Sequence, residues 1–165
     1  MRLALTIAAL VVAAPAMAES PEHEVVGHIK QQLACRSDPD AVPLLTYLSQ
    51  RGYISLVEAK KSDSTSCWRM HRPLDMDGIA IQGVCAANED PFMRAMYPNI
   101  FWRGPGTSAG TLLSVATSIS ITATKSWANQ HGINAHDVDK SLDFNGLTKI
   151  ECNSLNRRDN GPTNE

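Results

Sequence analysis

The sequence predicts an α+β fold: an N-terminal helix pair packed on a four- to five-stranded, mainly antiparallel sheet, with short C-terminal helices. Three observations predict it. Apolar residues recur at helical spacing over 21–34 and 41–51, and alternating apolar residues flank a polar turn at 75–78, as in a β-hairpin. The chain also contains four cysteines, an even number that favours two disulfides. Its 165 residues are enough for one domain and few for two.

The first 18 residues have the composition of a secretory signal peptide. Arg2 supplies a positive charge, 3–12 is an apolar run, and 16–18 (A-M-A) has the small residues of a cleavage site. We therefore expect an exported protein, located in the periplasm or the extracellular medium, whose mature domain covers 19–152. A membrane-spanning helix needs about 20 apolar residues, and no later stretch comes close, so we expect no transmembrane segment in the mature chain.

The charge balance excludes one class of partner. The whole chain has 15 basic and 17 acidic residues, a net charge of −2, and removal of Arg2 with the signal makes it −3. A nucleic-acid-binding domain usually has a strongly basic face, so we expect no nucleic-acid partner.

The four cysteines, Cys35, Cys67, Cys85 and Cys152, all lie in the predicted mature chain. No C-x-x-C pair is present, so disulfides are favoured over a metal site, each contributing about 2–4 kcal/mol. Three pairings are possible. In the hairpin register centred at 76–77, Cys67 and Cys85 point to opposite faces, which favours Cys35–Cys67 with Cys85–Cys152. A slip of one residue inverts that assignment.

Local signals place the individual elements. Ser20 and Pro21 begin the first helix, Asp40 caps the second, and Gly52 ends it. We expect strands at 53–59, 65–72, 78–86, 97–103 and 113–123, with turns at 60–64 and 145–146 and a helical turn after Asp90. Short helices are predicted at 124–131 and 135–142, and a disordered polar tail at 153–165.

Of all stretches of the sequence, the segment 103–111 (R-G-P-G-T-S-A-G-T) most resembles a binding motif. Its glycines and hydroxyls could expose backbone N–H groups to an anion, and Arg103 adds a positive charge. The segment lacks the lysine of a phosphate-binding P-loop, and Pro105 has no N–H group to donate. A structural turn and an anion- or ligand-binding loop are the two interpretations.

An aromatic pair precedes this loop. Phe101 and Trp102 are adjacent, so on a strand their side chains point to opposite faces. Either both pack against other elements, or Trp102 is exposed beside Arg103. An exposed tryptophan there would be a binding hot spot for a protein partner or a sugar ring.

Catalytic and metal-binding patterns are incomplete. His23 and His28 are one residue too far apart for the H-E-x-x-H zinc motif. The histidines and aspartates over 131–143 lack the glycine of a calcium loop. Ser108 could meet His71 and either Asp75 or Asp77 in a hydrolytic site, but no G-x-S-x-G elbow is present.

The sequence thus predicts a non-enzymatic, exported, disulfide-stabilised binding module that engages a protein or a cell-envelope component. The alternative is a small envelope hydrolase or carbohydrate-active protein with its site at 103–111. We predict no cofactor and no metal, and the oligomeric state stays open. The predicted binding residues are Trp102, Arg103, Gly104, Gly106, Thr107 and Ser108.

Overall fold

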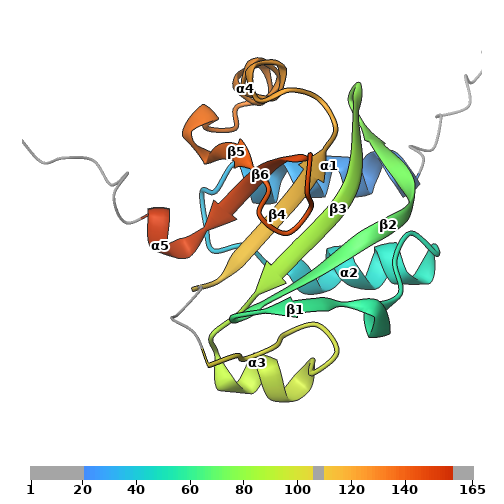
Figure 1. Cartoon of the computed structure of the whole chain (residues 1–165), viewed down its shortest axis with the longest axis vertical. Coiled ribbons are helices and arrows are strands. Elements are labelled where there is room, and N and C mark those ends of the chain that lie inside the picture. The colour runs from blue at the N-terminus through green and yellow to red at the C-terminus, as the bar shows by residue number, and fades with distance from the viewer. Residues whose placement is uncertain (1–20, 106–109, 158–165) are drawn as a thin grey trace, which may run out of the picture.

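A computed structural model describes residues 21–105 and 110–157 and confirms the α+β fold with two disulfides (Figure 1). The described strands form one antiparallel sheet of six strands, not the four or five predicted, in the order β1-β2-β3-β4-β6-β5. The strands are β1 (Lys60–Ser62), β2 (Thr65–Met76), β3 (Ile79–Ala87), β4 (Leu112–Thr117), β5 (Val138–Lys140) and β6 (Thr148–Asn153). The helices are α1 (Pro21–Leu33), α2 (Ala41–Gln50), α3 (Pro91–Met96), α4 (Ile121–Gln130) and α5 (Ser154–Arg157), with 3-10 turns η1 (Leu56–Glu58) and η2 (Ala135–Asp137).

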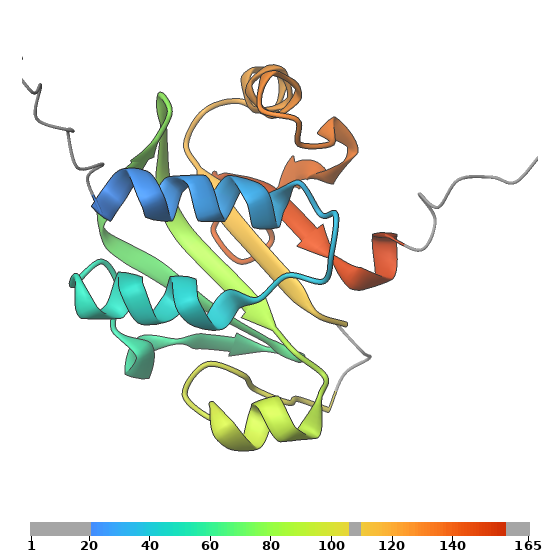
Figure 2. The same ribbon diagram turned by 180° about the vertical axis from the view of Figure 1, so that it is seen from behind.

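The helix pair covers one face of the sheet, as predicted. Figure 2 shows α1 and α2 lying side by side across the strands. Both helices place their apolar stripes against the sheet, because residues three and four apart share one helix face. The main core contains Val25, Ile29, Leu33, Leu44, Leu45 and Leu48 from the helices, together with Trp68, Val84, Leu113, Val115 and Ile150 from the strands.

The ends of α2 follow the predicted signals. The carboxylate of Asp40 accepts a hydrogen bond from the backbone N–H of Val42 at 3.1 Å, which satisfies a free donor of the first turn. Gly52 has φ +70°, the left-handed conformation that ends a helix and favours glycine. Ser20, the predicted cap of α1, lies outside the described residues, as does the predicted signal peptide.

The hairpin of β2 and β3 contains a bulge that the sequence analysis missed. At the tip, Met76 pairs with Ile79 around the turn residues Asp77 and Gly78, which both have positive φ. Between Arg69 and Leu74 the register shifts, because four residues of β2 are opposed by one residue of β3. Beyond the bulge the pairing differs by one residue from the predicted register.

The disulfide pairing favoured by the sequence is therefore wrong. Cys67 lies directly opposite Cys85 and bonds to it, with a Cα–Cα distance of 4.0 Å. Cys35, just after α1, bonds to Cys152 in β6, with a Cα–Cα distance of 5.2 Å. The Cys67–Cys85 disulfide cross-links the two hairpin strands. The Cys35–Cys152 disulfide joins the helix layer to β6, the strand next to the edge strand β5.

Several predicted elements have other boundaries or another conformation. The segment 53–59 contains η1 instead of a strand, and β1 occupies part of the predicted turn at 60–64. The strand predicted at 113–123 ends at Thr117, because the hydroxyl of Ser120 caps α4 by accepting a hydrogen bond from Ala123 N–H at 3.3 Å. The segment 97–103 is not a strand, 138–140 is a strand instead of part of a helix, and β6 was not predicted.

The C-terminal boundary also differs. Asn153 is the last residue of β6 and 154–157 form α5, so the predicted disorder does not apply to 153–157. The rest of the predicted tail lies outside the described residues. No helix within the described residues is long and apolar enough to cross a bilayer.

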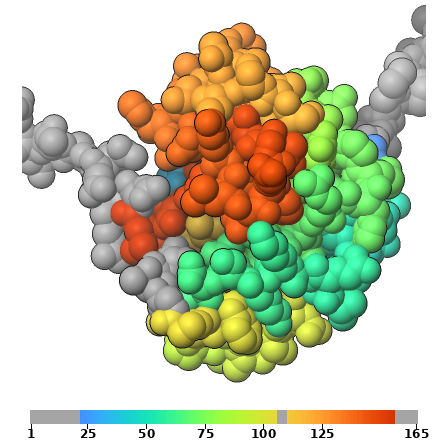
Figure 3. All heavy atoms as spheres, in the orientation of Figure 1, coloured from blue at the N-terminus to red at the C-terminus, as the bar shows by residue number. Residues whose placement is uncertain are grey.

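The face of the sheet opposite α1 and α2 has a smaller core of its own. The loop between β5 and β6 folds over it, and Figure 3 shows this deep-orange part of the chain covering the middle of that face. The ring of Phe144 lies so close to Gly83 that a Cβ there would be 2.6 Å from it. The cluster comprises Cys67, Cys85, Ala87, Leu112, Ala116 and Phe144.

Candidate functional site

The segment that follows α3 is a folded turn. The backbone N–H groups of Ile100 and Phe101 both donate to the carbonyl of Tyr97 at 2.9 Å. Phe101 is buried and meets the ring of Tyr97 edge-on, with ring centroids 6.5 Å apart. Trp102 is 39% exposed. Of the two alternatives for this aromatic pair, the structure has the one in which Phe101 packs in the core and Trp102 faces solvent.

Trp102 is held in place by its neighbours. The ammonium of Lys61 in β1 lies 5.0 Å from the centre of the indole ring, within the range of a cation–π contact. Arg103 donates a hydrogen bond of 2.7 Å to the hydroxyl of Ser64, a buried residue of the turn between β1 and β2. The indole ring therefore contacts β1 at the edge of the sheet, and the guanidinium group is hydrogen-bonded to the turn that follows β1.

Gly104 explains why the chain can approach this turn so closely. A Cβ at Gly104 would lie 1.7 Å from the backbone carbonyl oxygen of Asp63, so only glycine fits there without displacing backbone. The role that the structure gives Gly104 is close packing. Gly106, Thr107 and Ser108 lie outside the described residues.

Two further exposed apolar side chains belong to the same stretch of chain. Phe92 is 67% exposed and Met96 is 57% exposed, and they lie one turn apart on α3, on the same helix face. Figure 1 shows α3 and the segment after it at one end of the sheet, next to β1. We call Phe92, Met96, Trp102, Lys61 and Arg103 the α3 surface.

The residues considered for a hydrolytic site are engaged in other contacts. His71 on β2 lies 3.5 Å from the carboxylate of Glu58. Asp75 accepts a hydrogen bond from Gly78 N–H at 2.8 Å within the hairpin turn. Asp77 forms an ion pair with Lys30 of α1. Ser108, the proposed nucleophile, lies outside the described residues.

The Asp77 contact gives a pH-dependent prediction. The hydrogen bond from Lys30 lowers the pKa of Asp77, more than burial raises it, and His131 and His23 add smaller attractive charges. A lowered folded-state pKa stabilises the fold above the unfolded-state value of about 4 and loses that effect in acid. Because both side chains are partly exposed, we expect Asp77→Asn to cost about 0.5–1 kcal/mol near neutral pH.

Urea denaturation of both proteins measures this effect. The difference in unfolding free energy between wild type and Asp77→Asn should be present at about pH 7 and shrink below about pH 4. Asp139→Asn, which alters an exposed carboxylate on β5, is the control. A difference that persists undiminished in acid would contradict the role of the Asp77 carboxylate.

The histidines and aspartates over 131–143 do not form one cluster. His136, Asp137 and Asp139 line a small cavity of about 140 Å³, whereas His131 lies beside Asp77 and Asp143 beside Cys85. Burial and the neighbouring carboxylate of Glu151 raise the pKa of Asp137. Glu151 is itself paired with Lys149 at 2.7 Å. A larger cavity of about 460 Å³ lies between α1 and α2, lined by Glu24, His28, Gln31, Pro43, Leu44 and Tyr47 among others.

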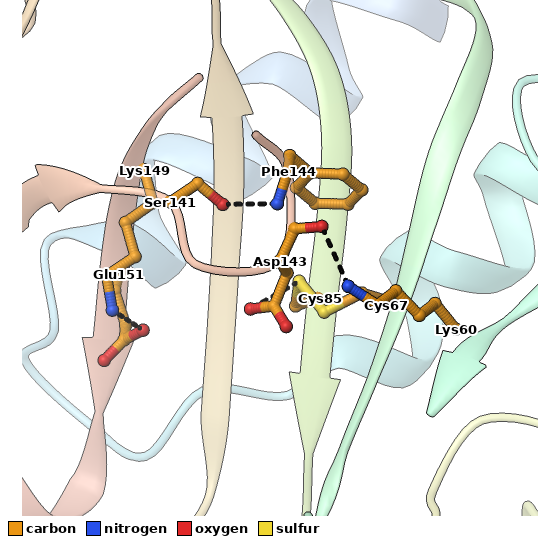
Figure 4. Close-up of a disulfide and its surroundings, with 8 residues drawn as sticks. All are labelled: Lys60, Cys67, Cys85, Ser141, Asp143, Phe144, Lys149 and Glu151. Carbon is orange, nitrogen blue, oxygen red and sulfur yellow. Dashed lines mark hydrogen bonds and ion pairs between the residues drawn. A yellow bond between two sulfur atoms is a disulfide. The ribbon is translucent and has the colours of Figure 1, made fainter. Parts of the chain in front are cut away.

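One cluster of side chains with metal-ligand chemistry was missed by the sequence analysis. Within the described residues, the ligand atoms of Cys67, Cys85 and Asp143 lie within 4.8 Å of one another. Figure 4 shows the Asp143 carboxylate beside the disulfide. Asp143 is 58 residues from Cys85 along the chain, so no spacing pattern links them.

Comparison of the chain with protein-family models, with curated proteins and with solved structures gives no match. The functional proposal below therefore rests on the sequence and the geometry of the α3 surface.

Proposed function

We propose that this protein is an exported, disulfide-stabilised binding module without enzymatic activity, which engages a protein or another cell-envelope component through the α3 surface. The observation that carries this proposal is the partly exposed ring of Trp102 at the edge of the sheet. Tryptophan is among the residues most enriched in binding hot spots, where a few anchors supply most of the affinity.

The neighbours of Trp102 support the proposal in a second way. A side chain that is already held in one orientation loses less conformational entropy on binding than a free one. Lys61 contacts the indole ring itself, and the Arg103–Ser64 hydrogen bond restrains the next residue of the chain. Phe92 and Met96 add exposed apolar area on the adjoining helix, of the kind that a protein partner covers.

Export is part of the proposal and rests on the signal-like N-terminus. The two disulfides are compatible with it, because disulfides persist in oxidising compartments such as the periplasm and the extracellular medium.

Quantitative capture from envelope extracts tests the proposal. The full chain is immobilised as wild type, Trp102→Ala and Leu142→Ala, and the retained components are quantified. Leu142 is the matched control, since it is 90% exposed and lies on the loop between β5 and β6. For the components that the wild type retains, we expect the affinity of Trp102→Ala to be lower by about 30-fold or more, as for a hot spot, and that of Leu142→Ala to be unchanged.

Equal retention by all three proteins would contradict the proposed surface. Because Trp102 is partly exposed, both variants should keep a denaturation midpoint close to that of the wild type. That measurement separates lost binding from lost folding.

A further inference from the structure

We propose that Cys67, Cys85 and Asp143 form a zinc site when a dithiol reductant opens the Cys67–Cys85 disulfide. This site is independent of the α3 surface and its proposed role. Its basis is the convergence of two sulfur atoms and one carboxylate on the same face of the sheet (Figure 4).

The hairpin places both sulfur atoms on one side. Cys67 and Cys85 are direct cross-strand partners, so their Cβ atoms project from the same face of the sheet. Both are buried beneath the loop between β5 and β6. Reduction would therefore leave two thiols close together in a partly dry environment, held by the same strand pairing.

The loop holds Asp143 over this pair. Phe144 N–H donates to the hydroxyl of Ser141 at 3.0 Å, and Lys60 reaches the backbone carbonyl of Asp143 at 3.4 Å. The ring of Phe144 is packed on Gly83, which has no side chain to push it away. These contacts fix the backbone on both sides of Asp143 and direct its carboxylate toward Cys85.

The carboxylate has no hydrogen bond to gain from the disulfide. Asp143 Oδ2 lies 3.9 Å from Cys85 Sγ, but a disulfide sulfur carries no proton to donate. In the reduced state the same oxygen could accept from a thiol or, together with two thiolates, bind a cation. The geometry therefore matches the reduced chemistry better than the oxidised one.

The donor set fits zinc. Zinc takes thiolate sulfur at about 2.3 Å and carboxylate oxygen at about 2.0–2.2 Å in a tetrahedral arrangement, so neighbouring donors lie about 3.5–3.8 Å apart. The three atoms already lie within 4.8 Å, and the sulfur atoms need only separate by side-chain rotation. Water would take the fourth position. Two thiolates and one carboxylate with Zn²⁺ leave one negative charge, which Lys60 partly offsets.

The redox step balances as a thiol–disulfide exchange. The dithiol gives two electrons and two protons to the Cys67–Cys85 bond and becomes a disulfide itself. Zn²⁺ then binds the two cysteine sulfur atoms as thiolates, and their two protons pass to solvent. The Cys35–Cys152 pair is an internal comparison, because the described residues place no third ligand side chain within the same distance of it.

Zinc binding to the reduced full chain tests the proposal. A water-soluble phosphine is the reductant, because it takes oxygen from water, becomes a phosphine oxide and leaves two thiols without competing as a thiol ligand. Zn²⁺ is titrated against a chromophoric chelator. We expect one Zn²⁺ per reduced chain and none per oxidised chain, with affinity at least about tenfold lower in Asp143→Asn and unchanged in Asp139→Asn.

Alkylation mapping provides a second readout that remains decisive if the reduced chain loses structure. Zn²⁺ should protect Cys67 and Cys85 from alkylation and leave Cys35 and Cys152 reactive. Equal reactivity of all four cysteines, absence of binding, or equal affinity in Asp143→Asn would overturn the proposed site.

Discussion

Replacing Cys35 and Cys152 together with alanine should lower the unfolding free energy by about 4–5 kcal/mol, the larger of the two disulfide effects. This bond closes a separation of 117 residues, and closing a long loop removes more conformational entropy from the unfolded chain than closing a short one. It also fixes the end of α1 to β6, so its loss should loosen the helix layer from the sheet. Urea denaturation under non-reducing conditions measures the change.

The second disulfide is the control. Cys67 and Cys85 close a separation of 18 residues, so their replacement with alanine should cost about 3 kcal/mol. If this double variant lost as much stability as the first, or more, chain entropy would not explain the contribution of the Cys35–Cys152 bond.

Gly104→Ala should destabilise the protein by about 2–3 kcal/mol, because the added methyl group would overlap the backbone at Asp63. The neighbouring backbone cannot rotate away as a flexible side chain could. Relief of the overlap requires that the segment around Arg103 move off the turn between β1 and β2. The hydrogen bond from Arg103 to Ser64 would then be lost, and Trp102 would lose its fixed orientation.

Gly27→Ala is the matched substitution with the opposite expected sign. Gly27 lies within α1, and a Cβ there would meet nothing within 4 Å. Alanine should therefore raise the unfolding free energy by about 0.5–1 kcal/mol through its better helix propensity. Thermal or urea denaturation of both variants tests the contrast. If Gly104→Ala were as stable as the wild type, the close packing at Asp63 would be refuted.

The sequence predicted those parts of the fold that depend on local signals. The helix pair was predictable because apolar spacing and the Asp40 cap act within a few residues. A hairpin turn within 75–78 and the helical turn after Asp90 were predictable for the same reason, although the pairing centres on Asp77 and Gly78 and not on 76–77. In each case the hydrogen bonds that determine the local conformation join residues only a few positions apart in the sequence.

The disulfide pairing was not predictable because it depends on a bulge. Three extra residues of β2 between Arg69 and Leu74 shift the register, and one residue of shift moves a side chain to the other face. Pro73 lies inside this stretch, yet nothing local to it determines how many residues are left unpaired. The strand β6 was missed since its pairing with β4 is long-range.

The candidate site was predictable only in part. Because Phe101 and Trp102 are adjacent, the sequence suggested that one could be buried and the other exposed. The structure has Phe101 buried and Trp102 exposed, although the segment is a turn instead of a strand. Lys61 contacts Trp102 and Ser64 accepts the hydrogen bond of Arg103, and both partners lie some 40 residues earlier in the chain, so composition does not indicate these contacts. The approach of Asp143 to the hairpin disulfide is equally non-local.

Disulfide mapping combined with cell fractionation is the most direct test of the proposal that this chain is exported and stabilised by these two bonds. The full chain is produced in a bacterial host, the periplasmic and medium fractions are collected, and peptides are analysed without reduction. We expect exported protein in which Cys35 is joined to Cys152 and Cys67 to Cys85. Retention of the chain in the cytoplasm with four free thiols would contradict the export, and a Cys35–Cys67 bond would contradict the arrangement of the sheet.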